Sequence, residues 1–270
     1  MTSQIRPPAV AGQFYALDPA LLLREIREYT STGVVKQRAF GCIVPHAGYM
    51  YSGHVAGAVY ASLQLTRRYV ILCPNHTGVG APLAINSTGT WETPLGEVPV
   101  ASELAEALKG AFPLLAEDRL AHRAEHALEV QLPFLQTLME EFQFVPITVG
   151  TSRLDVLQQL GQAIFESLRE LPEPAMVIAS SDMNHYESDS VTRVKDRKAI
   201  DRILALDPDG LYDTIQREHI TMCGYGPAVA MLTAVKSLGA TRAELVKYAT
   251  SGDISGDRGW VVGYAGIAIH

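Results

Sequence analysis

The amino-acid sequence predicts an α/β fold with three layers, α/β/α, around a central mixed and mostly parallel sheet. Strand-like apolar runs alternate along the chain with longer helix-like segments, which is the order typical of this class. The strand-like runs are apolar throughout, as expected for strands covered on both faces. No repeat, low-complexity tract or linker divides the sequence, so we expect residues 1–270 to form one domain.

The first half of the chain opens with a clearly marked helix. Asp18 suits the N-cap and Pro19 the first helical position, ahead of the apolar periodicity of residues 20–30. Residues 81–100 predict a hairpin or an extension of the sheet edge. The other elements expected here are strands at 39–44 and 68–73 and helices at 54–65, 102–112 and 125–142, with Pro133 kinking the last helix or marking its true start.

The second half continues the same alternation. Asp207 and Pro208 open one helix, and Gly239 stops another. The expected strands are 144–150, 175–180, 244–251 and 259–269, and the expected helices are 152–170, two between residues 181 and 225, and 226–240.

Charge and composition exclude several classes of partner and compartment. The net charge is −7 and no Lys/Arg run is present, so neither nucleic acid nor an anionic membrane surface is an expected partner. No apolar stretch of about 18 residues or signal-peptide core occurs. Three widely spaced cysteines do not make a disulfide framework, and together these features indicate a cytoplasmic protein.

Polar residues of the same kinds follow three of the expected strands. His46 ends CIVPH, His76 ends VILCPNH, and Asp182 and His185 lie in VIASSDMNH. In an open α/β sheet, ligands bind at the carboxyl ends of the strands. Glycine follows closely in HAG and HTG, which lets a metal approach the backbone. The pattern predicts metal ligation by His46 and His76, against the alternative of hydrogen-bonded structural histidines.

The cysteines fall into two groups. Cys42 and Cys73 lie inside strand-like runs and are expected to be small buried hydrophobes. Cys223 lies just ahead of the helix at 226–240, where a helix N-terminus favours the thiolate. It is therefore a third metal ligand, a nucleophile or another buried hydrophobe, and the sequence does not choose among these.

Further candidates surround these positions. Glu125 either complements the dipole of the expected helix at 125–142 or orients a ligating histidine from behind, with His126 beside it. Tyr49 and Tyr51 flank the His46 loop and either contact a substrate or wall the cleft. The remaining histidines are assigned to structure or surface: His54, His122, His219 and His270.

Several familiar catalytic motifs are missing from the sequence. It contains no G-x-S-x-G elbow, no phosphate-binding Walker loop, no G-x-G-x-x-G, no C-x-x-C and no H-E-x-x-H. A nucleotide enzyme, a serine hydrolase of the α/β type and a zincin are therefore disfavoured.

Seven blocks spread along the chain carry a family resemblance. They read RPPAVAGQFY, VPHAGYMYSG, PNHTG, EHALEVQLPFL, SSDMNHY, MCGYGP and SGDISGD. Together they resemble the MEMO-like family, whose bacterial and archaeal members are also called AmmeMemoRadiSam system protein B. The resemblance implies a fold similar to that of class III extradiol dioxygenases, which are non-haem iron enzymes. It also implies a functional link to a radical SAM protein and an AMMECR-like protein.

The same resemblance implies a ligand set. His46, His76 and Cys223 match the family's metal-site residues, and Asp182 and His185 match its SSD…H block. The family is linked to iron or copper. Extradiol enzymes bind iron through two histidines and a carboxylate, whereas a thiolate at Cys223 softens the site toward zinc or Cu(I). Asp182 is the alternative third ligand, and His185 is then the natural general acid or base.

Three hypotheses of function follow. The first is a non-haem iron- or copper-dependent oxidoreductase, similar to a dioxygenase, that acts on a small molecule of unknown identity. The second is a non-catalytic metal-binding or adaptor protein that works with a protein or peptide partner. The third is a hydrolase with Cys223 as its nucleophile and a histidine as its base.

Overall fold

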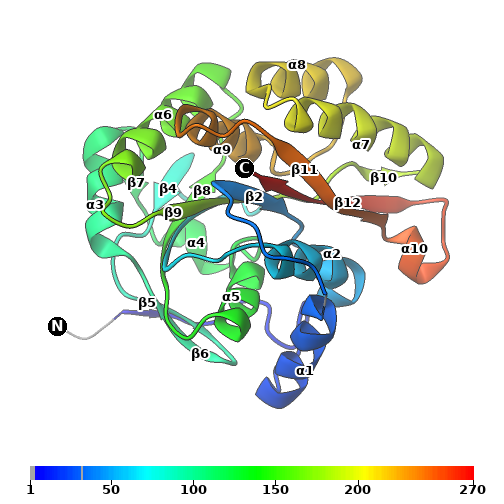
Figure 1. Ribbon diagram of the computed structural model, residues 1–270, viewed down its shortest axis with the longest axis horizontal. Coiled ribbons are helices and arrows are strands. Elements are labelled where there is room, and N and C mark those ends of the chain that lie inside the picture. The colour runs from blue at the N-terminus through cyan, green and yellow to red at the C-terminus, as the bar shows by residue number, and fades with distance from the viewer. Residues whose placement is uncertain (1–3, 32) are drawn as a thin grey trace.

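A nine-stranded mixed sheet runs through the centre of the computed structural model, which describes residues 4–31 and 33–270 (Figure 1). The strand order is β10-β12-β2-β9-β3-β8-β4-β7, and β11 also pairs with β12. The strands of this sheet are β2 (Gly41–Val44), β3 (Arg68–Pro74), β4 (Leu83–Ile85), β7 (Ala116–Glu117), β8 (Gln143–Val149), β9 (Ala175–Ser180), β10 (His185–Glu187), β11 (Ala243–Thr250) and β12 (Val261–Ile269).

The centre of the sheet is parallel, and the strand next to it on each side, β12 and β4, runs antiparallel to it. β2, β9, β3 and β8 pair in parallel. β12 runs antiparallel to β2, β10 and β11, and β4 runs antiparallel to β8. The predicted α/β class with a mixed sheet is confirmed. Because β2, β3 and β9 are parallel neighbours, their carboxyl ends meet at one edge.

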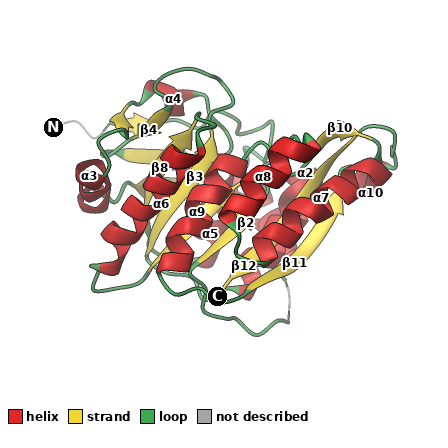
Figure 2. Ribbon diagram, turned by 90° about the horizontal axis from the view of Figure 1, so that it is seen from above, coloured by secondary structure: helices red, strands yellow, loops and turns green. Residues whose placement is uncertain are grey.

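Helices cover both faces of the sheet. Figure 2 shows α3, α6, α9, α8 and α7 lying across one face, and Figure 1 shows α1, α2 and α5 on the other. The second face also carries a small sheet, β1-β5-β6. The helices are α1 (Pro19–Thr30), α2 (Tyr49–Ser62), α3 (Ser102–Ala111), α4 (Leu120–Arg123), η1 (Glu129–Gln131), α5 (Leu132–Leu138), α6 (Leu154–Arg169), α7 (Asp189–Leu204), α8 (Pro208–Glu218), α9 (Tyr225–Ser237) and α10 (Gly252–Ser255). Within the described part of the chain, every helix is too short or too polar to cross a membrane.

The two faces of the sheet bury two separate apolar cores. In β3, Val70 and Leu72 point into the core beneath α6 and α9. Tyr69, Ile71 and Cys73 point into the core beneath α2 and α5. Successive side chains of a strand point to opposite faces, so a strand buried on both faces must be apolar throughout. This accounts for the continuous apolar runs, and Cys42 and Cys73 are buried as expected.

Several predicted boundaries change in the structure. The helix expected from residue 54 begins at Tyr49, where Gly48 occupies the N-cap position. The helix expected over 125–142 is broken: residues 124–128 are irregular, and Pro133 lies in the first turn of α5, so it marks the start of that helix. Proline lacks a backbone N–H and cannot continue a helix from upstream.

The region of residues 81–100 divides between the two sheets. β5 (Thr90–Thr93) and β6 (Gly96–Pro99) form the expected hairpin, and β5 pairs with β1 (Ile5–Arg6). β4 instead extends the central sheet beside β8. Both predictions for this segment are therefore correct in part: one part forms a hairpin and another extends the central sheet. The short strand β10 was not predicted from the sequence.

Candidate metal centre

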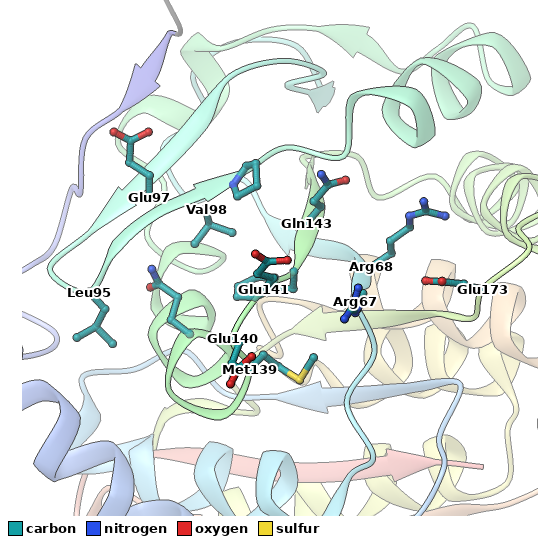
Figure 3. Close-up of a pocket in the computed structure, with 13 residues that line it drawn as sticks. Arg67, Arg68, Leu95, Glu97, Val98, Met139, Glu140, Glu141, Gln143 and Glu173 are labelled. Atoms are coloured by element: carbon teal, nitrogen blue, oxygen red, sulfur yellow. The ribbon is translucent and has the colours of Figure 1, made fainter.

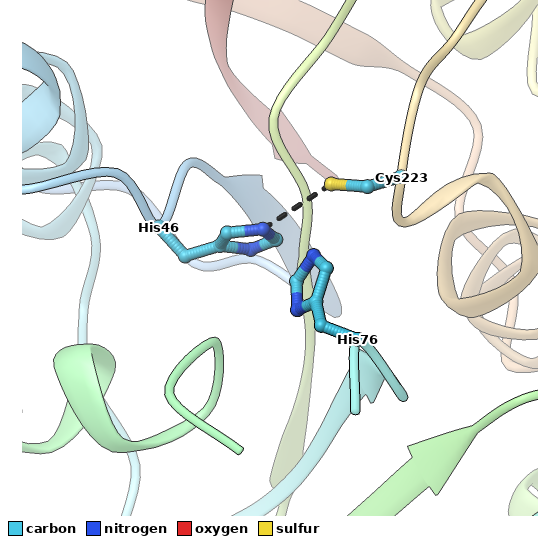
Figure 4. A group of neighbouring side chains, drawn as sticks. All are labelled: His46, His76 and Cys223. Atoms are coloured by element: carbon cyan, nitrogen blue, oxygen red, sulfur yellow. Dashed lines mark hydrogen bonds between the residues drawn. The ribbon is translucent and has the colours of Figure 1, made fainter. Parts of the chain in front are cut away.

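Three loops converge at the carboxyl edge of the parallel strands (Figure 4). His46 follows β2 after Pro45, and His76 lies two residues beyond the end of β3. Val44 of β2 pairs in register with Ser180 of β9, so the ends of these strands are level. Cys223 arrives from the loop between α8 and α9. The fold thus brings together the two histidines predicted as metal ligands and the cysteine that the family resemblance adds to them.

The Cys223 loop lies against the end of β9 because Gly224 has no side chain. A Cβ atom at Gly224 would lie 2.5 Å from both the Ser180 carbonyl oxygen and the Ser181 Cβ atom. The backbone N–H of Gly224 instead donates to the Ser181 hydroxyl oxygen, at 3.0 Å. The glycine after Cys223 therefore fixes how deeply the thiol enters the site.

Donor atoms of His46, His76 and Cys223 all lie within 4.8 Å of one another. The Cys223 Sγ atom is 3.2 Å from the His46 Nε2 atom. The two imidazole rings are 5.1 Å apart between centroids and nearly perpendicular, at 80°. Ring nitrogens carry their lone pairs in the ring plane, and perpendicular planes can cross at a shared ion. Two imidazoles and one sulfur at this spacing suit a transition metal.

The tautomer of His46 is set by the Ser180 hydroxyl group. That hydroxyl donates its one hydrogen to the Ala127 carbonyl oxygen at 2.6 Å. Its oxygen accepts from the Gln131 side-chain amide at 2.9 Å, and lies 3.0 Å from His46 Nδ1. Because the hydroxyl hydrogen is already used, His46 Nδ1 must be the donor. The Nε2 lone pair then faces Cys223, as a metal ligand requires.

The charge of His46 is set by its burial. The side chain is 2% exposed. Burial, followed by the nearby His76 and His126, holds the pKa of His46 well below its usual value. The ring is therefore neutral at pH 7 and keeps the lone pair on Nε2.

His76 is oriented by a buried carboxylate. Glu125 is fully buried, and its two oxygens accept from the His76 backbone N–H at 2.6 Å and from His76 Nδ1 at 2.9 Å. The Ala127 backbone N–H adds a third bond, at 2.9 Å. Burial acts to raise the pKa of Glu125, but these hydrogen bonds outweigh it and the pKa is lowered. Of the two roles considered for Glu125, the geometry matches the one in which it orients a ligating histidine.

Cys223 differs from the expectation for a helix N-terminus. Burial, reinforced by the neighbouring Asp182 carboxylate, raises the pKa of the thiol. The protonated thiol can donate to the lone pair on His46 Nε2. A bound cation would displace this proton, since metal binding to cysteine releases a proton.

His126 lies beside the donor group without converging on it. Its ring stacks on His76 at 4.7 Å with an interplanar angle of 20°. The lone pairs of two nearly parallel rings do not meet at one point, although His76, Glu125 and His126 together form a second set of close donor atoms. Burial lowers the pKa of His126, so this ring packs in its neutral form.

Asp182 and His185 lie next to the donor group and serve other contacts. The Asp182 carboxylate accepts from the His46 backbone N–H at 2.8 Å, and burial raises its pKa. His185 Nδ1 lies 2.9 Å from the Thr221 carbonyl oxygen. Because a carbonyl only accepts, Nδ1 carries a hydrogen, and in a neutral ring Nε2 is then the nitrogen with the lone pair. Among the described residues, neither Asp182 nor His185 belongs to a group of close metal-donor atoms.

Tyr49 is part of the core. Its side chain is 3% exposed, and its hydroxyl donates to the Val130 carbonyl oxygen at 2.6 Å. The ring packs against Phe134 at 4.8 Å. Its hydroxyl is therefore not free to bind a substrate, and Tyr49 is not among the residues that line the cavity beside His76 and Cys223. The histidines assigned to structure or surface lie outside the groups of close donor atoms found in the described residues: His54, His122, His219 and His270.

Two cavities differ in their relation to this centre. One of about 250 Å³ is lined by His76 and Cys223 and gives access to the donor group. A larger one, about 620 Å³, is shown in Figure 3 and is lined by residues that include Arg68 and Gln143, the first residues of β3 and β8. It therefore lies at the opposite end of the strands, away from the metal-donor residues. Of these two cavities, the smaller one is the one next to the candidate metal ligands His76 and Cys223.

Sequence reasoning missed the residues behind His46. Ser180 and Gln131 are fully buried and polar, yet both stand in apolar stretches, VIASSD and EVQLPFL. A polar residue inside such a run was the available signal, because a buried polar group needs a partner.

Comparisons with known proteins agree along almost the whole chain. The family model described as Memo-like protein matches residues 6–268. A MEMO1 family protein of Methanosarcina mazei is 45% identical over 269 residues, covering 99% of this chain and 100% of the relative. One from Methanothermobacter thermautotrophicus is 45% identical over 273 residues, covering 97% and 99%.

A solved structure is similar in fold. The crystal structure of an uncharacterized protein from Escherichia coli K12 matches with a TM-score of 0.58. The match covers 86% of this chain and 100% of that one, at 13% sequence identity. At this identity the likeness concerns the fold alone.

Proposed function

The chain belongs to the Memo-like family, and from this premise and the geometry of the centre we propose that it is a metal-binding protein with oxidoreductase activity. His46, His76 and Cys223 would hold iron or copper. The observation that carries the proposal is the convergence of these three donors within 4.8 Å, with both imidazoles backed by hydrogen-bond acceptors. Partners behind a ligating histidine fix its tautomer and are typical of metal sites.

The donor set fits a redox metal. Two neutral imidazoles and one sulfur suit Cu(I), thiolate-bound iron and zinc. Of these, iron and copper supply one-electron and oxygen chemistry when bound. The cavity of about 250 Å³ beside His76 and Cys223 leaves room for a small substrate at the same place. We therefore favour a small-molecule oxidoreductase, similar to a dioxygenase, over a centre closed by protein ligands.

Asp182 and His185 would serve the centre without binding the metal. Asp182 anchors the His46 loop through the backbone N–H of that residue. His185, with Nδ1 bonded to the Thr221 carbonyl, offers Nε2 to accept a proton and can return it. The raised pKa of Cys223 weighs against the alternative of a cysteine nucleophile, because only a thiolate attacks efficiently.

Elemental analysis of protein purified without oxygen and without a histidine tag tests the proposal. The comparison is the triple variant His46→Ala/His76→Ala/Cys223→Ala. We expect near-stoichiometric iron or copper in the wild type and none in the variant. Oxygen consumption would then be screened with small substrates, catechols first.

Other results would revise the proposal. No metal in the wild type, and no uptake on reconstitution, would overturn it. Stoichiometric metal without oxygen consumption would favour the non-catalytic metal-binding or adaptor alternative.

A further inference from the structure

A buried arginine from the N-terminal strand reaches the segment that holds Glu125. Arg6, at the end of β1, is 8% exposed. Its Nε and Nη2 atoms donate to the His122 carbonyl oxygen at 3.2 and 3.1 Å, and Nη2 also donates to the Glu125 carbonyl oxygen at 2.7 Å. Its guanidinium carbon lies 4.3 Å from the centroid of the Trp91 ring. One side chain thus binds two carbonyl groups from the stretch ahead of Glu129.

The charge of Arg6 is balanced by Glu129, which is fully buried. Nη1 of Arg6 forms an ion pair with this carboxylate. The same carboxylate accepts from the Ala9 and Val10 backbone N–H groups at 2.7 and 3.1 Å, and from the Tyr15 hydroxyl at 2.6 Å. Every contact joins the N-terminal segment to the segment beside the metal centre. A fully bonded ion pair of this kind holds its surroundings in one arrangement.

The segment that Arg6 holds has little regular structure of its own. Residues 124–128 lie between α4 and η1 and belong to neither. Helical hydrogen bonds therefore do not fix the Glu125 backbone, and its carbonyl is held by Arg6. On the other side of the same residue, the Glu125 carboxylate receives both N–H groups of His76. Glu125 is thus the link between a rigid ion pair and a candidate metal ligand.

We propose that Arg6 and Glu129 form a clamp that positions Glu125, and through it the His76 imidazole, for metal binding. The inference rests on the proposed function only for the role of His76 as a ligand. Its geometric part, that the clamp sets the tautomer and orientation of His76, applies equally to the metal-free protein. Arginine is needed because its planar fork reaches two carbonyls and a carboxylate at once, which lysine cannot do.

The first experiment is metal-free. Two-bond nitrogen–proton NMR spectra of protein labelled with ¹⁵N in histidine report which His76 nitrogen carries the hydrogen. The wild type should show a single tautomer protonated at Nδ1. The variant Arg6→Met/Glu129→Met removes both charges together, and Arg6→Lys keeps a cation opposite Glu129. In each folded variant we expect His76 to lose its fixed tautomer. An unchanged His76 signal in either folded variant would overturn the proposal.

A matched control separates positioning from general loosening. Arg193 pairs with Asp189 and Asp253 on α7 and α10, and does not contact the 122–129 segment. Arg193→Met should leave the His76 signal unchanged. If it alters that signal as much as Arg6→Lys does, the clamp has no specific role.

The second experiment uses cobalt(II) as a spectroscopic probe of binding. Arg6→Lys should bind it about tenfold more weakly than the wild type, within the range seen for residues behind metal ligands. In the double variant, Arg6→Lys should weaken cobalt binding little beyond the loss caused by Glu125→Gln alone. The two losses should not add, because Arg6 acts on the metal site through Glu125. Fully additive losses would contradict the clamp. Absence of cobalt binding in the wild type would count against the proposed function, while the NMR result would still decide the clamp.

Discussion

The two histidines of the centre lie at equivalent strand ends, but their Nδ1 atoms donate to different kinds of acceptor. His46 is almost fully buried and donates to the neutral hydroxyl of Ser180, whereas the His76 side chain is 32% exposed and donates to the carboxylate of Glu125. A charged acceptor makes the stronger hydrogen bond and raises the basicity of the ligand nitrogen. The centre therefore has a neutral buried side and a charged, more accessible side. Substitutions should affect the two sides differently.

Removal of either imidazole should have the largest effect. His46→Ala and His76→Ala should each weaken metal binding by more than about 100-fold, beyond the range for residues behind the ligands. The fold should survive in both. His46→Ala should also cost on the order of 1–3 kcal/mol of stability, because it empties a buried position and leaves Ser180 short of a partner. Metal content and thermal unfolding measure these effects, and retention of metal by either variant would refute its role as a ligand.

Glu125→Gln should have the second-largest effect on metal affinity, and it should act only through His76 on the charged side. The amide keeps the shape but replaces the anionic acceptor of His76, so metal affinity should fall about 10–100-fold. Glu140→Gln, at an exposed position, is the matched control and should bind metal as the wild type does. Isothermal titration of reduced protein with zinc would measure both. Equal affinity in the two variants would show that the carboxylate does not support His76.

Ser180→Ala should have a smaller effect on metal affinity and a visible effect on stability. The Gln131 amide, His46 Nδ1 and the Ala127 carbonyl each lose a hydrogen-bond partner, at a cost of about 1–3 kcal/mol. The affinity should fall less than in Glu125→Gln, because a neutral acceptor is lost. Ser190→Ala, on the exposed surface of α7, is the control for urea unfolding. If Ser180→Ala lowered metal affinity more than Glu125→Gln does, the hydroxyl of Ser180 would be the more important support, which would contradict the distinction between the two sides.

The sequence was informative about the ligands and much less so about what supports them. His46, His76 and Cys223 could be named because strand ends, glycines and family blocks mark their positions. Ser180 and Gln131 could not, since their partners lie 53 and 86 residues away along the chain. Such pairings depend on tertiary packing, which no local pattern encodes.

The same limit explains the error over residues 125–142. Their apolar spacing suits a helix, yet Glu125 lies in an irregular stretch and directs its carboxylate toward His76. Three hydrogen bonds to this buried carboxylate outweigh local helix propensity, which amounts to less than about 1 kcal/mol per residue. A functional site thus breaks a periodic pattern that would otherwise be obeyed.

The pH dependence of the free energy of unfolding in acid should distinguish the charged side of the centre from the neutral side. We expect this to be the smallest of the effects, and it should appear in Glu125→Gln but not in Ser180→Ala. The folded-state pKa of Glu125 is lowered, so its contribution is fully present above the usual glutamate pKa and is lost as the pH falls through the lowered value. In metal-free protein, Glu125→Gln should therefore flatten the loss of stability below about pH 4.5. Ser180→Ala should lower the whole curve without changing its slope, because a hydroxyl does not titrate there. Urea unfolding between pH 3 and 7 would measure both, and parallel curves for wild type and Glu125→Gln would contradict the charged pairing of Glu125 with His76.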